Sequence, residues 1–323
     1  MKRAKGSRPV GASGKKRKTS RSGRASSPTA PTRPHVGGPL LIVAVADHPL
    51  GGALRLAEAL ARRDHLTAHV LALVPPLSVS MSALESLAAD LEPRELDDFL
   101  REKARLRTQR RVHQSVGLSS FFSTSAETGP VETTAAAHAR GRAAAYLLVG
   151  LAPAETTARN TTVATASRLA AEAGVPVLAC TPEVDQLPDS ALVVTDFSEA
   201  SLRAARASLP LLAEGGSVTL AHVIPGSSAT SAAKPAANVL RRLADELGEI
   251  GKITVQVATL EGAPLGVLAE WVPQFDLVAL GTTSRGESEA EGEVAAAVFR
   301  HARGSVLIAP PASGSTSHRQ GSR

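Results

Sequence analysis

The sequence predicts an α/β protein in which two open parallel five-stranded sheets follow one another in tandem, each with helices on both faces. Aliphatic runs such as residues 40–46 are continuous rather than alternating, which is typical of strands buried on both faces. These runs alternate with segments of helical periodicity, which favours parallel pairing through right-handed crossovers. The same order of elements then occurs twice: Gly150 precedes Val177 by 27 residues, and Gly281 precedes Val306 by 25.

The first repeat is expected over residues 38–183. Residues 51–63 place Leu54, Ala57 and Leu60 at helical spacing between two aliphatic runs, the second of which ends at Pro75-Pro76. Strands are predicted at 40–46, 68–74, 120–125, 146–150 and 175–180. Helices are predicted at 51–63, 93–113, 132–142 and 165–173.

The second repeat is expected over residues 189–312. Strands are predicted at 191–196, 217–224, 254–259, 276–281 and 305–310. Helices are predicted at 201–214, 236–248, 264–272 and 294–301. The linker around residues 181–188 is short, so the two repeats are expected to pack against each other.

The two ends of the chain differ in composition from the repeats. The first 34 residues contain 11 Lys and Arg and no acid, so the rest, with 25 basic and 30 acidic residues, is mildly acidic. Residues 1–37 and 313–323 have little to bury and are predicted to be disordered. The cluster Lys15-Lys16-Arg17-Lys18 could hold polyanions non-specifically by counterion release, or could serve a solubilising tail.

Several classes of protein are excluded or disfavoured. The single cysteine, Cys180, rules out an internal disulfide and lies in an apolar run, as a buried hydrophobe would. No apolar stretch is long enough for a membrane span, and no apolar segment follows the N-terminal charges. We therefore expect a cytoplasmic protein without a membrane partner. The histidines show no metal-ligand spacing, His222 and His301 are interpreted as structural, and no nucleophile elbow is present, so no enzyme activity is expected.

Four blocks in the second repeat carry a resemblance to a known family. They are Val194-Thr195-Asp196-Phe197-Ser198-Glu199-Ala200-Ser201, Leu260-Glu261-Gly262-Ala263-Pro264, Asp276-Leu277-Val278-Ala279-Leu280-Gly281, and Phe299-Arg300-His301-Ala302 before Val306-Leu307-Ile308. In this order they resemble universal stress proteins over residues 189–310. The first repeat resembles the family more weakly, through Thr128-Gly129-Pro130 and Val175-Pro176-Val177-Leu178-Ala179. The resemblance implies Rossmann-like sheets of the adenine nucleotide alpha hydrolase type.

One branch of that family binds ATP, and the resemblance implies which residues would do so here. An acid after the first strand would contact ribose, and a glycine-rich loop after the fourth strand would hold phosphates. The implied candidates are Asp196, Val223, Gly281 and Gly292. In the loop, Ser284 stands where the second glycine belongs, and Gly292 follows Gly281 by 11 residues rather than 13. Four carboxylates also crowd this loop and would repel phosphate: Glu287, Glu289, Glu291 and Glu293.

The first repeat departs further from that pattern. After Gly150 come Pro153 and Val163 at the positions of the later glycines. Ala46 stands where the acid would align. Asp47, one place on, is either shifted in register or a solvated turn residue.

These observations predict a non-catalytic stress-response module that acts through protein contacts, with a degenerate nucleotide site and no cofactor. The alternative is a stress sensor that binds ATP or another adenine nucleotide in the second repeat. A third reading is a polyanion binder driven by residues 1–37. The resemblance also implies an intramolecular tandem dimer or a homodimer, with strands 175–180 and 305–310 buried against each other.

Overall fold

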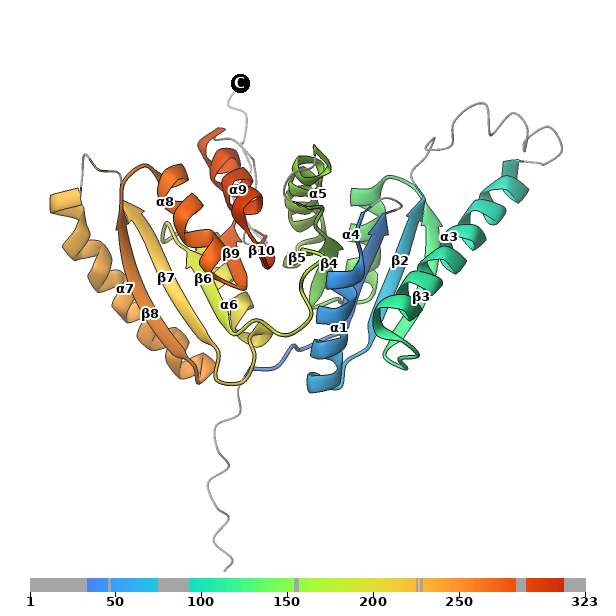
Figure 1. Cartoon of the computed structure of the whole chain (residues 1–323), viewed down its shortest axis with the longest axis horizontal. Coiled ribbons are helices and arrows are strands. Elements are labelled where there is room, and N and C mark those ends of the chain that lie inside the picture. The colour runs from blue at the N-terminus through green and yellow to red at the C-terminus, as the bar shows by residue number, and fades with distance from the viewer. Residues whose placement is uncertain are drawn as a thin grey trace, which may run out of the picture. The chain divides into compact units, whose positions relative to one another are not determined.

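The computed structural model describes residues 34–45, 48–74, 93–153, 157–224, 226, 229–282 and 289–310. The predicted tails lie almost entirely outside this range, as do Ala46 and Asp47. The described strands form one ten-stranded sheet in the order β3-β2-β1-β4-β5-β10-β9-β6-β7-β8 (Figure 1). We call residues 34–180 the N-terminal half and residues 190–310 the C-terminal half.

The N-terminal half has five strands and four described helices. Its strands are β1 (Leu40–Val45), β2 (Ala68–Val74), β3 (Phe122–Thr128), β4 (Tyr146–Gly150) and β5 (Val177–Cys180). Its helices are α1 (Gly51–Asp64), α3 (Pro93–Val116), α4 (Val131–Gly141) and α5 (Thr157–Ala173).

The C-terminal half repeats this arrangement. Its strands are β6 (Ser190–Val194), β7 (Ser217–Ile224), β8 (Thr254–Glu261), β9 (Leu277–Gly281) and β10 (Ser305–Ala309). Its helices are α6 (Glu199–Ser208), α7 (Ala229–Gly251), α8 (Pro264–Trp271) and α9 (Glu289–His301), with short 3-10 turns at η1 (Leu209–Leu211) and η3 (Val272–Gln274).

The two halves join through their fifth strands. β5 and β10 pair antiparallel, with Leu178 opposite Leu307, whereas the other neighbouring strands pair parallel. The predicted pairing of these edge strands is confirmed. The prediction of two separate five-stranded sheets is wrong, because this pairing makes the sheet continuous. Each fifth strand alone would leave a row of backbone groups unpaired, and the pairing satisfies them.

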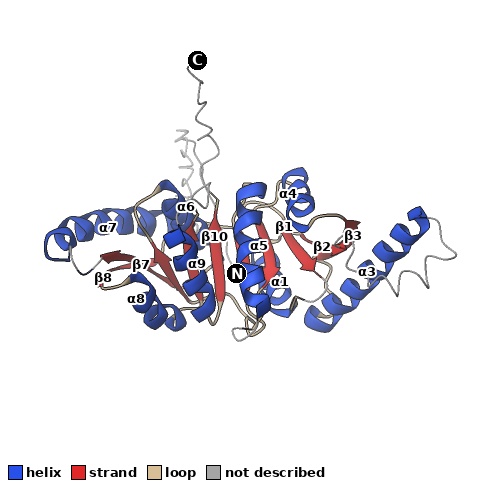
Figure 2. Cartoon of the chain, turned by 90° about the horizontal axis from the view of Figure 1, so that it is seen from above, coloured by secondary structure: helices blue, strands red, loops and turns tan. Residues whose placement is uncertain are grey.

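Helices cover both faces of the sheet. On one face α1 and α6 pack on the strands, with Leu54, Leu60 and Ala204 fully buried. On the other face, α4, α5, α8 and α9 cover a second core that includes Leu169, Val298 and Phe299. α5 and α9 contact each other across the junction between the halves (Figure 2). No helix in the described ranges is long and apolar enough to cross a membrane.

Most predicted element bounds match within three residues. The larger differences are at three helix starts and at the end of α6, which is Ser208 rather than 214 because the 3-10 turn η1 follows it. α5 begins at Thr157 rather than 165, α7 at Ala229 rather than 236, and α9 at Glu289 rather than 294. Their first turns carry few apolar residues, so apolar periodicity does not reveal them. The start of α9 matters for function, because it places residues 289–293 in a helix rather than in a loop.

Candidate functional site

A cavity of about 260 Å³ opens at the carboxyl ends of β6, β7 and β9. β6 lies between β9 and β7 in the sheet, and the chain runs from β6 to β7 through α6 on one face. It reaches β9 through α8, on the other face. Such a switch in the direction of chain connection separates the loops at the carboxyl edge, and ligands of open α/β sheets bind there.

The polar side of this cavity is built by the turn from β6 into α6. Thr195, Asp196, Ser198 and Ser201 line it. Ser198 caps α6, because its Oγ accepts a 3.2 Å hydrogen bond from the backbone N–H of Ser201. Thr195 and Ser201 are buried, and their hydroxyls lie 2.9 Å apart. Hydrogen bonds of the side chains of Thr195, Ser198 and Ser201 thus stabilise this turn.

The carboxylate of Asp196 is the only acidic group among the described lining residues of this cavity. Its Oδ1 accepts a 2.9 Å hydrogen bond from the backbone N–H of Ser198. Burial raises the pKa of Asp196, but the hydrogen bonds from Ser198 and Ser201 outweigh it and hold the pKa below its ordinary value. Asp196 therefore presents a negative charge at neutral pH.

His222 reaches the same cavity from β7. Its Nδ1 lies 2.7 Å from the carbonyl oxygen of Thr195, which can only accept, so Nδ1 carries the proton. In the neutral ring Nε2 is then an acceptor. The ring also packs against Phe197, with centroids 4.5 Å apart, and Phe197 adopts a left-handed φ of 65° at the turn. His222 thus both supports the β6–α6 turn and lines the site.

The remaining wall of the cavity is apolar. It is formed by Val194, Val223, Pro264, Leu268, Leu280 and Val294. These side chains come from β6, β7, α8, β9 and α9. A half-polar, half-apolar cavity of this kind suits a ligand with a flat apolar part and a hydroxylated part.

The structure brings three of the four predicted nucleotide residues together. Asp196, Val223 and Gly281 line the cavity, whereas Gly292 is not among its lining residues. Gly292 lies in the first turns of α9, with open space where a Cβ would stand. Gly292 therefore lies at the start of a helix rather than in a loop, and its role in holding phosphate stays a prediction.

Close packing against α6 requires a glycine at position 281. A Cβ built at Gly281 would lie 2.3 Å from both the carbonyl carbon of Ala200 and the backbone nitrogen of Ser201. Gly150 is the counterpart in the N-terminal half, where a Cβ would lie 1.4 Å from the carbonyl oxygen of Pro49. In both halves the glycine at the end of the fourth strand lets the first helix approach the sheet.

Some predicted residues of the N-terminal half cannot be placed in a site. Ala46 and Asp47 lie outside the described residues. Val163 lies within α5 and packs against the core of one sheet face. The candidate site is therefore the one in the C-terminal half.

Sequence reasoning did not propose Thr195, Ser198, Ser201 or His222 as site residues. The first three sit within the block that carried the family resemblance, so that block held the signal. His222 was interpreted as structural, and its strand gave no sign that the ring faces the β6–α6 turn.

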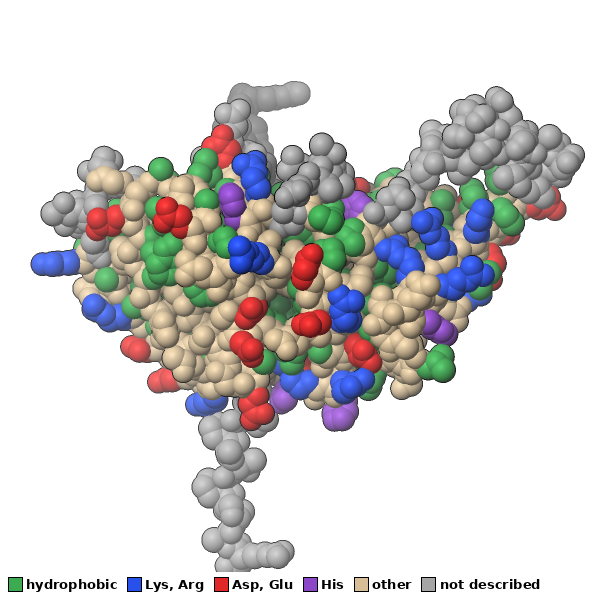
Figure 3. All heavy atoms as spheres, in the orientation of Figure 1, with side chains coloured by type: hydrophobic (Ala, Val, Ile, Leu, Met, Phe, Trp, Pro, Cys, Tyr) green, Lys and Arg blue, Asp and Glu red, His purple; other side chains and the backbone are tan. Residues whose placement is uncertain are grey.

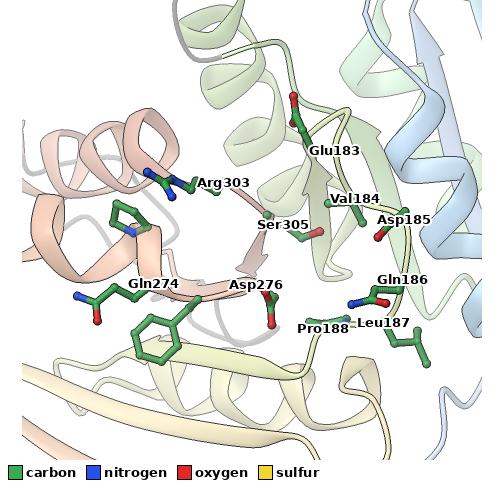
Figure 4. Close-up of a pocket in the computed structure, with 13 residues that line it drawn as sticks. Glu183, Val184, Asp185, Gln186, Leu187, Pro188, Gln274, Asp276, Arg303 and Ser305 are labelled. Carbon is green, nitrogen blue, oxygen red and sulfur yellow. The ribbon is translucent and has the colours of Figure 1, made fainter.

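A second cavity, of about 240 Å³, lies where the linker between the halves crosses the starts of β6, β9 and β10 (Figure 4). Glu183, Asp185, Asp276 and Arg303 line it. Asp276 is already engaged, since its Oδ2 accepts from the N–H of Asp189 at 3.1 Å and from the N–H and hydroxyl of Ser190. This cavity lies at the amino ends of the strands of the C-terminal half, opposite the edge where its first cavity opens.

In the described part of the chain no group of three or more His, Cys, Asp or Glu side chains could hold a metal ion. The fold is an open α/β sheet with a cavity at the point where the chain connection switches direction. Comparison with family models matches residues 189–310 to the universal stress protein family.

Similarity to solved structures extends over both halves. A universal stress protein from Archaeoglobus fulgidus DSM 4304 matches with a TM-score of 0.63 at 16% identity, covering 86% of this chain and 98% of that one. A putative universal stress protein from Pseudomonas aeruginosa UCBPP-PA14 matches with a TM-score of 0.53 at 15% identity, covering 85% and 94%. At these identities the similarity shows the fold. No curated protein matches the sequence.

Proposed function

We propose that this protein is a non-catalytic stress-response module that acts through protein contacts. In this proposal the C-terminal half retains the part of a nucleotide site that binds a nucleoside. It has lost the part that binds a polyphosphate. The N-terminal half is a divergent second copy of the same domain. The observation that carries the proposal is the contrast between an intact cavity around Asp196 and the acidic first turns of α9.

The nucleoside side is supported by the cavity lining. The Asp196 carboxylate and the Ser198 and Ser201 hydroxyls offer hydrogen-bond partners for the vicinal hydroxyls of a ribose. Val223 and Leu268 offer an apolar wall for a base. A neutral nucleoside would match both sides of the cavity.

The phosphate side is opposed by charge. α9 contributes Val294 and Ala295 to the cavity, and its first turns contain Glu289, Glu291 and Glu293. Carboxylates at a helix start already complement the helix dipole, so less of it is left to attract phosphate. One carboxylate about 4 Å from a phosphate charge costs roughly 4 kcal/mol at an effective dielectric near 20.

The non-catalytic part of the proposal is supported by the hydrogen bonds in the site. Ser201 Oγ donates to the carbonyl of Ser198 at 2.9 Å, and His222 Nδ1 is bonded to the carbonyl of Thr195. The serine hydroxyl and the imidazole Nδ1–H thus each donate to a backbone carbonyl, and no hydrogen bond between Ser201 and His222 is found among the described residues. A Ser–His nucleophile would need them bonded to each other.

The experiment is thermal unfolding of the full chain with 1 mM adenosine or 1 mM ATP-Mg²⁺. Adenosine should stabilise the protein at least as much as ATP-Mg²⁺; a Kd of about 10 μM would add about 2.7 kcal/mol. Asp196→Ala should abolish the effect. Asp189→Ala, an exposed aspartate outside the cavity, is the matched control and should not.

The alternative, an ATP sensor, predicts that ATP-Mg²⁺ stabilises far more than adenosine, in a way that Asp196→Ala removes. The variant E289Q/E291Q/E293Q, which removes three negative charges from the start of α9, distinguishes the degenerate site from the ATP sensor. If charge excludes phosphate, this variant gains a response to ATP-Mg²⁺. Absence of any stabilisation by adenosine would show that the cavity is not a nucleoside site.

A further inference from the structure

Among the described residues, nothing covers the outer face of the long helix α3. Its inner side packs on α1, β2 and β3, with Thr108 and Val112 buried. Its outer side carries Phe99 and Leu106, which are 45% and 41% exposed. Leu118, just beyond the helix, is 91% exposed. Large apolar side chains that recur on one exposed helix face indicate contact with something other than water.

The same face is basic. Lys103 and Arg110 lie four and eleven residues after Phe99, which places them on the stripe that holds Leu106. Arg107 flanks this stripe, and all three cations are exposed. The Lys103 Nζ lies 5.8 Å from the centre of the Phe99 ring. Figure 3 shows blue side chains gathered over α3 with green among them.

The charge is concentrated in the second part of the helix. Residues 103–116 contain five Lys and Arg and no Asp or Glu. Two of these five are engaged within the protein: Arg105 pairs with Glu102 at 2.7 Å, and Arg111 donates to the carbonyl of His48. The helix dipole favours cations only in the last turn, so it does not account for Lys103 and Arg107.

We propose that this outer face of α3, made by Phe99, Lys103, Leu106, Arg107 and Arg110, docks the protein on an anionic lipid surface. Such a surface offers negative headgroups to the cations and an apolar boundary to the Phe and Leu side chains. A nucleic acid would match the charges, but its phosphates would leave Leu106 without an apolar partner. The inference is independent of the nucleoside site.

This proposal revises the expectation of no membrane partner. That expectation rested on the lack of a spanning segment, and docking at a lipid surface needs none. A helix that lies on a membrane is recognised by its charges and exposed apolar groups rather than by a long apolar run.

The test is co-sedimentation of the full chain with vesicles of phosphatidylglycerol and phosphatidylcholine, compared with phosphatidylcholine alone. Binding should require the anionic lipid. K103E/R110E should weaken binding at least tenfold, since each basic residue contributes about 1 kcal/mol at an anionic surface. R241E/R242E, two exposed arginines on α7, is the matched control and should bind like the unchanged chain.

The basic cluster at residues 15–18 could also bind these vesicles, so each variant is repeated with K15Q/K16Q/R17Q/K18Q. The α3 effect should persist in that background. F99S/L106S should weaken binding at high salt as well, where charge attraction is screened. Circular dichroism checks folding, and K103Q/R110Q replaces K103E/R110E if the latter does not fold.

Two results would overturn the proposal. One is vesicle binding that is unchanged by K103E/R110E in both tail backgrounds. The other is binding to duplex DNA, but not to vesicles, that is lost in K103E/R110E and indifferent to F99S/L106S. The second result would make a nucleic acid the occupant of this face.

Discussion

The hydroxyl of Tyr146 in β4 donates a 2.7 Å hydrogen bond to the carbonyl oxygen of Ala207 in α6, which links the two halves of the chain. Tyr146 is only 5% exposed, and burial raises the pKa of its hydroxyl well above the ordinary value. The hydroxyl therefore remains a donor over the whole physiological pH range. The contact lies between elements 61 residues apart and adds to the β5–β10 pairing.

Tyr146→Phe should lower the free energy of unfolding by about 1–2 kcal/mol, because it leaves a partly buried carbonyl without this hydrogen bond. Urea unfolding followed by the fluorescence of Trp271, the single tryptophan, and by circular dichroism measures this loss. Thr133→Val, which removes an exposed hydroxyl, should change stability by less than about 0.5 kcal/mol. Equal losses of stability in the two variants would show that the hydrogen bond from Tyr146 to Ala207 does not stabilise the protein.

Arg63→Met should destabilise the protein by about 2–3 kcal/mol. Arg63 donates to the carbonyls of Pro210 and Leu212 at the end of η1, and it forms a two-pronged pair with the buried carboxylate of Asp64. Arg62, its neighbour on α1, forms an exposed pair with Glu58. Arg62→Met is therefore the control, with a loss of about 0–1 kcal/mol in the same denaturation experiment.

Gly281→Ala should be strongly destabilising, by about 3 kcal/mol or more, because the new Cβ would overlap the backbone of α6 at Ser201. Gly292→Ala is the comparison at the other predicted glycine. It should stabilise the protein by about 0.5–1 kcal/mol, since Gly292 lies in a helix with open space around it. A large loss of stability in Gly292→Ala would indicate that this position requires a glycine. Thermal unfolding of both variants measures these changes in stability.

Stability should fall as the pH drops from about 6.5 to 4 because of His69. Burial, and then the charges of Arg142 and His138, lower the pKa of His69 to about 4 in the folded protein. The unfolded chain therefore takes up the proton first as the pH falls, which favours unfolding. Its ring nitrogens lie 2.8 Å from Ser123 Oγ and 2.7 Å from Ser125 Oγ.

His69→Gln should flatten this part of the pH profile, measured as the melting temperature between pH 4 and pH 7. His113→Gln, at an exposed position on α3, is the control and should leave the slope unchanged. Glu127 lies 3.8 Å from His138 and Arg142 contacts both imidazoles, so these groups should be left intact in the comparison. An identical slope in His69→Gln would assign the pH dependence to other groups.

Cys180 should not react with a thiol reagent in the folded protein. It is fully buried in β5, and burial raises its pKa to about 12, so no thiolate is available at neutral pH. The reaction with 5,5′-dithiobis(2-nitrobenzoic acid) should proceed only in denaturant. Rapid labelling of the native chain would show that the β5–β10 junction opens.

The sequence predicted most of the fold, because the aliphatic runs and their helical spacing reflect local periodicity. The predicted strand 217–224 matches β7, and the predicted strand 146–150 matches β4. Local periodicity failed at Glu289, where a polar first turn of α9 was interpreted as a loop.

For the site, the family resemblance predicted Asp196, Val223 and Gly281, and all three line one cavity in the structure. Only the tertiary structure added His222, because its contact with Thr195 joins residues 27 apart through neighbouring strands. The family resemblance predicted that the two fifth strands pair, and the structure added their antiparallel register, with Leu178 opposite Leu307. Periodicity along the chain indicates which residues are buried. The pairing of the buried strands depends on contacts across the whole sheet.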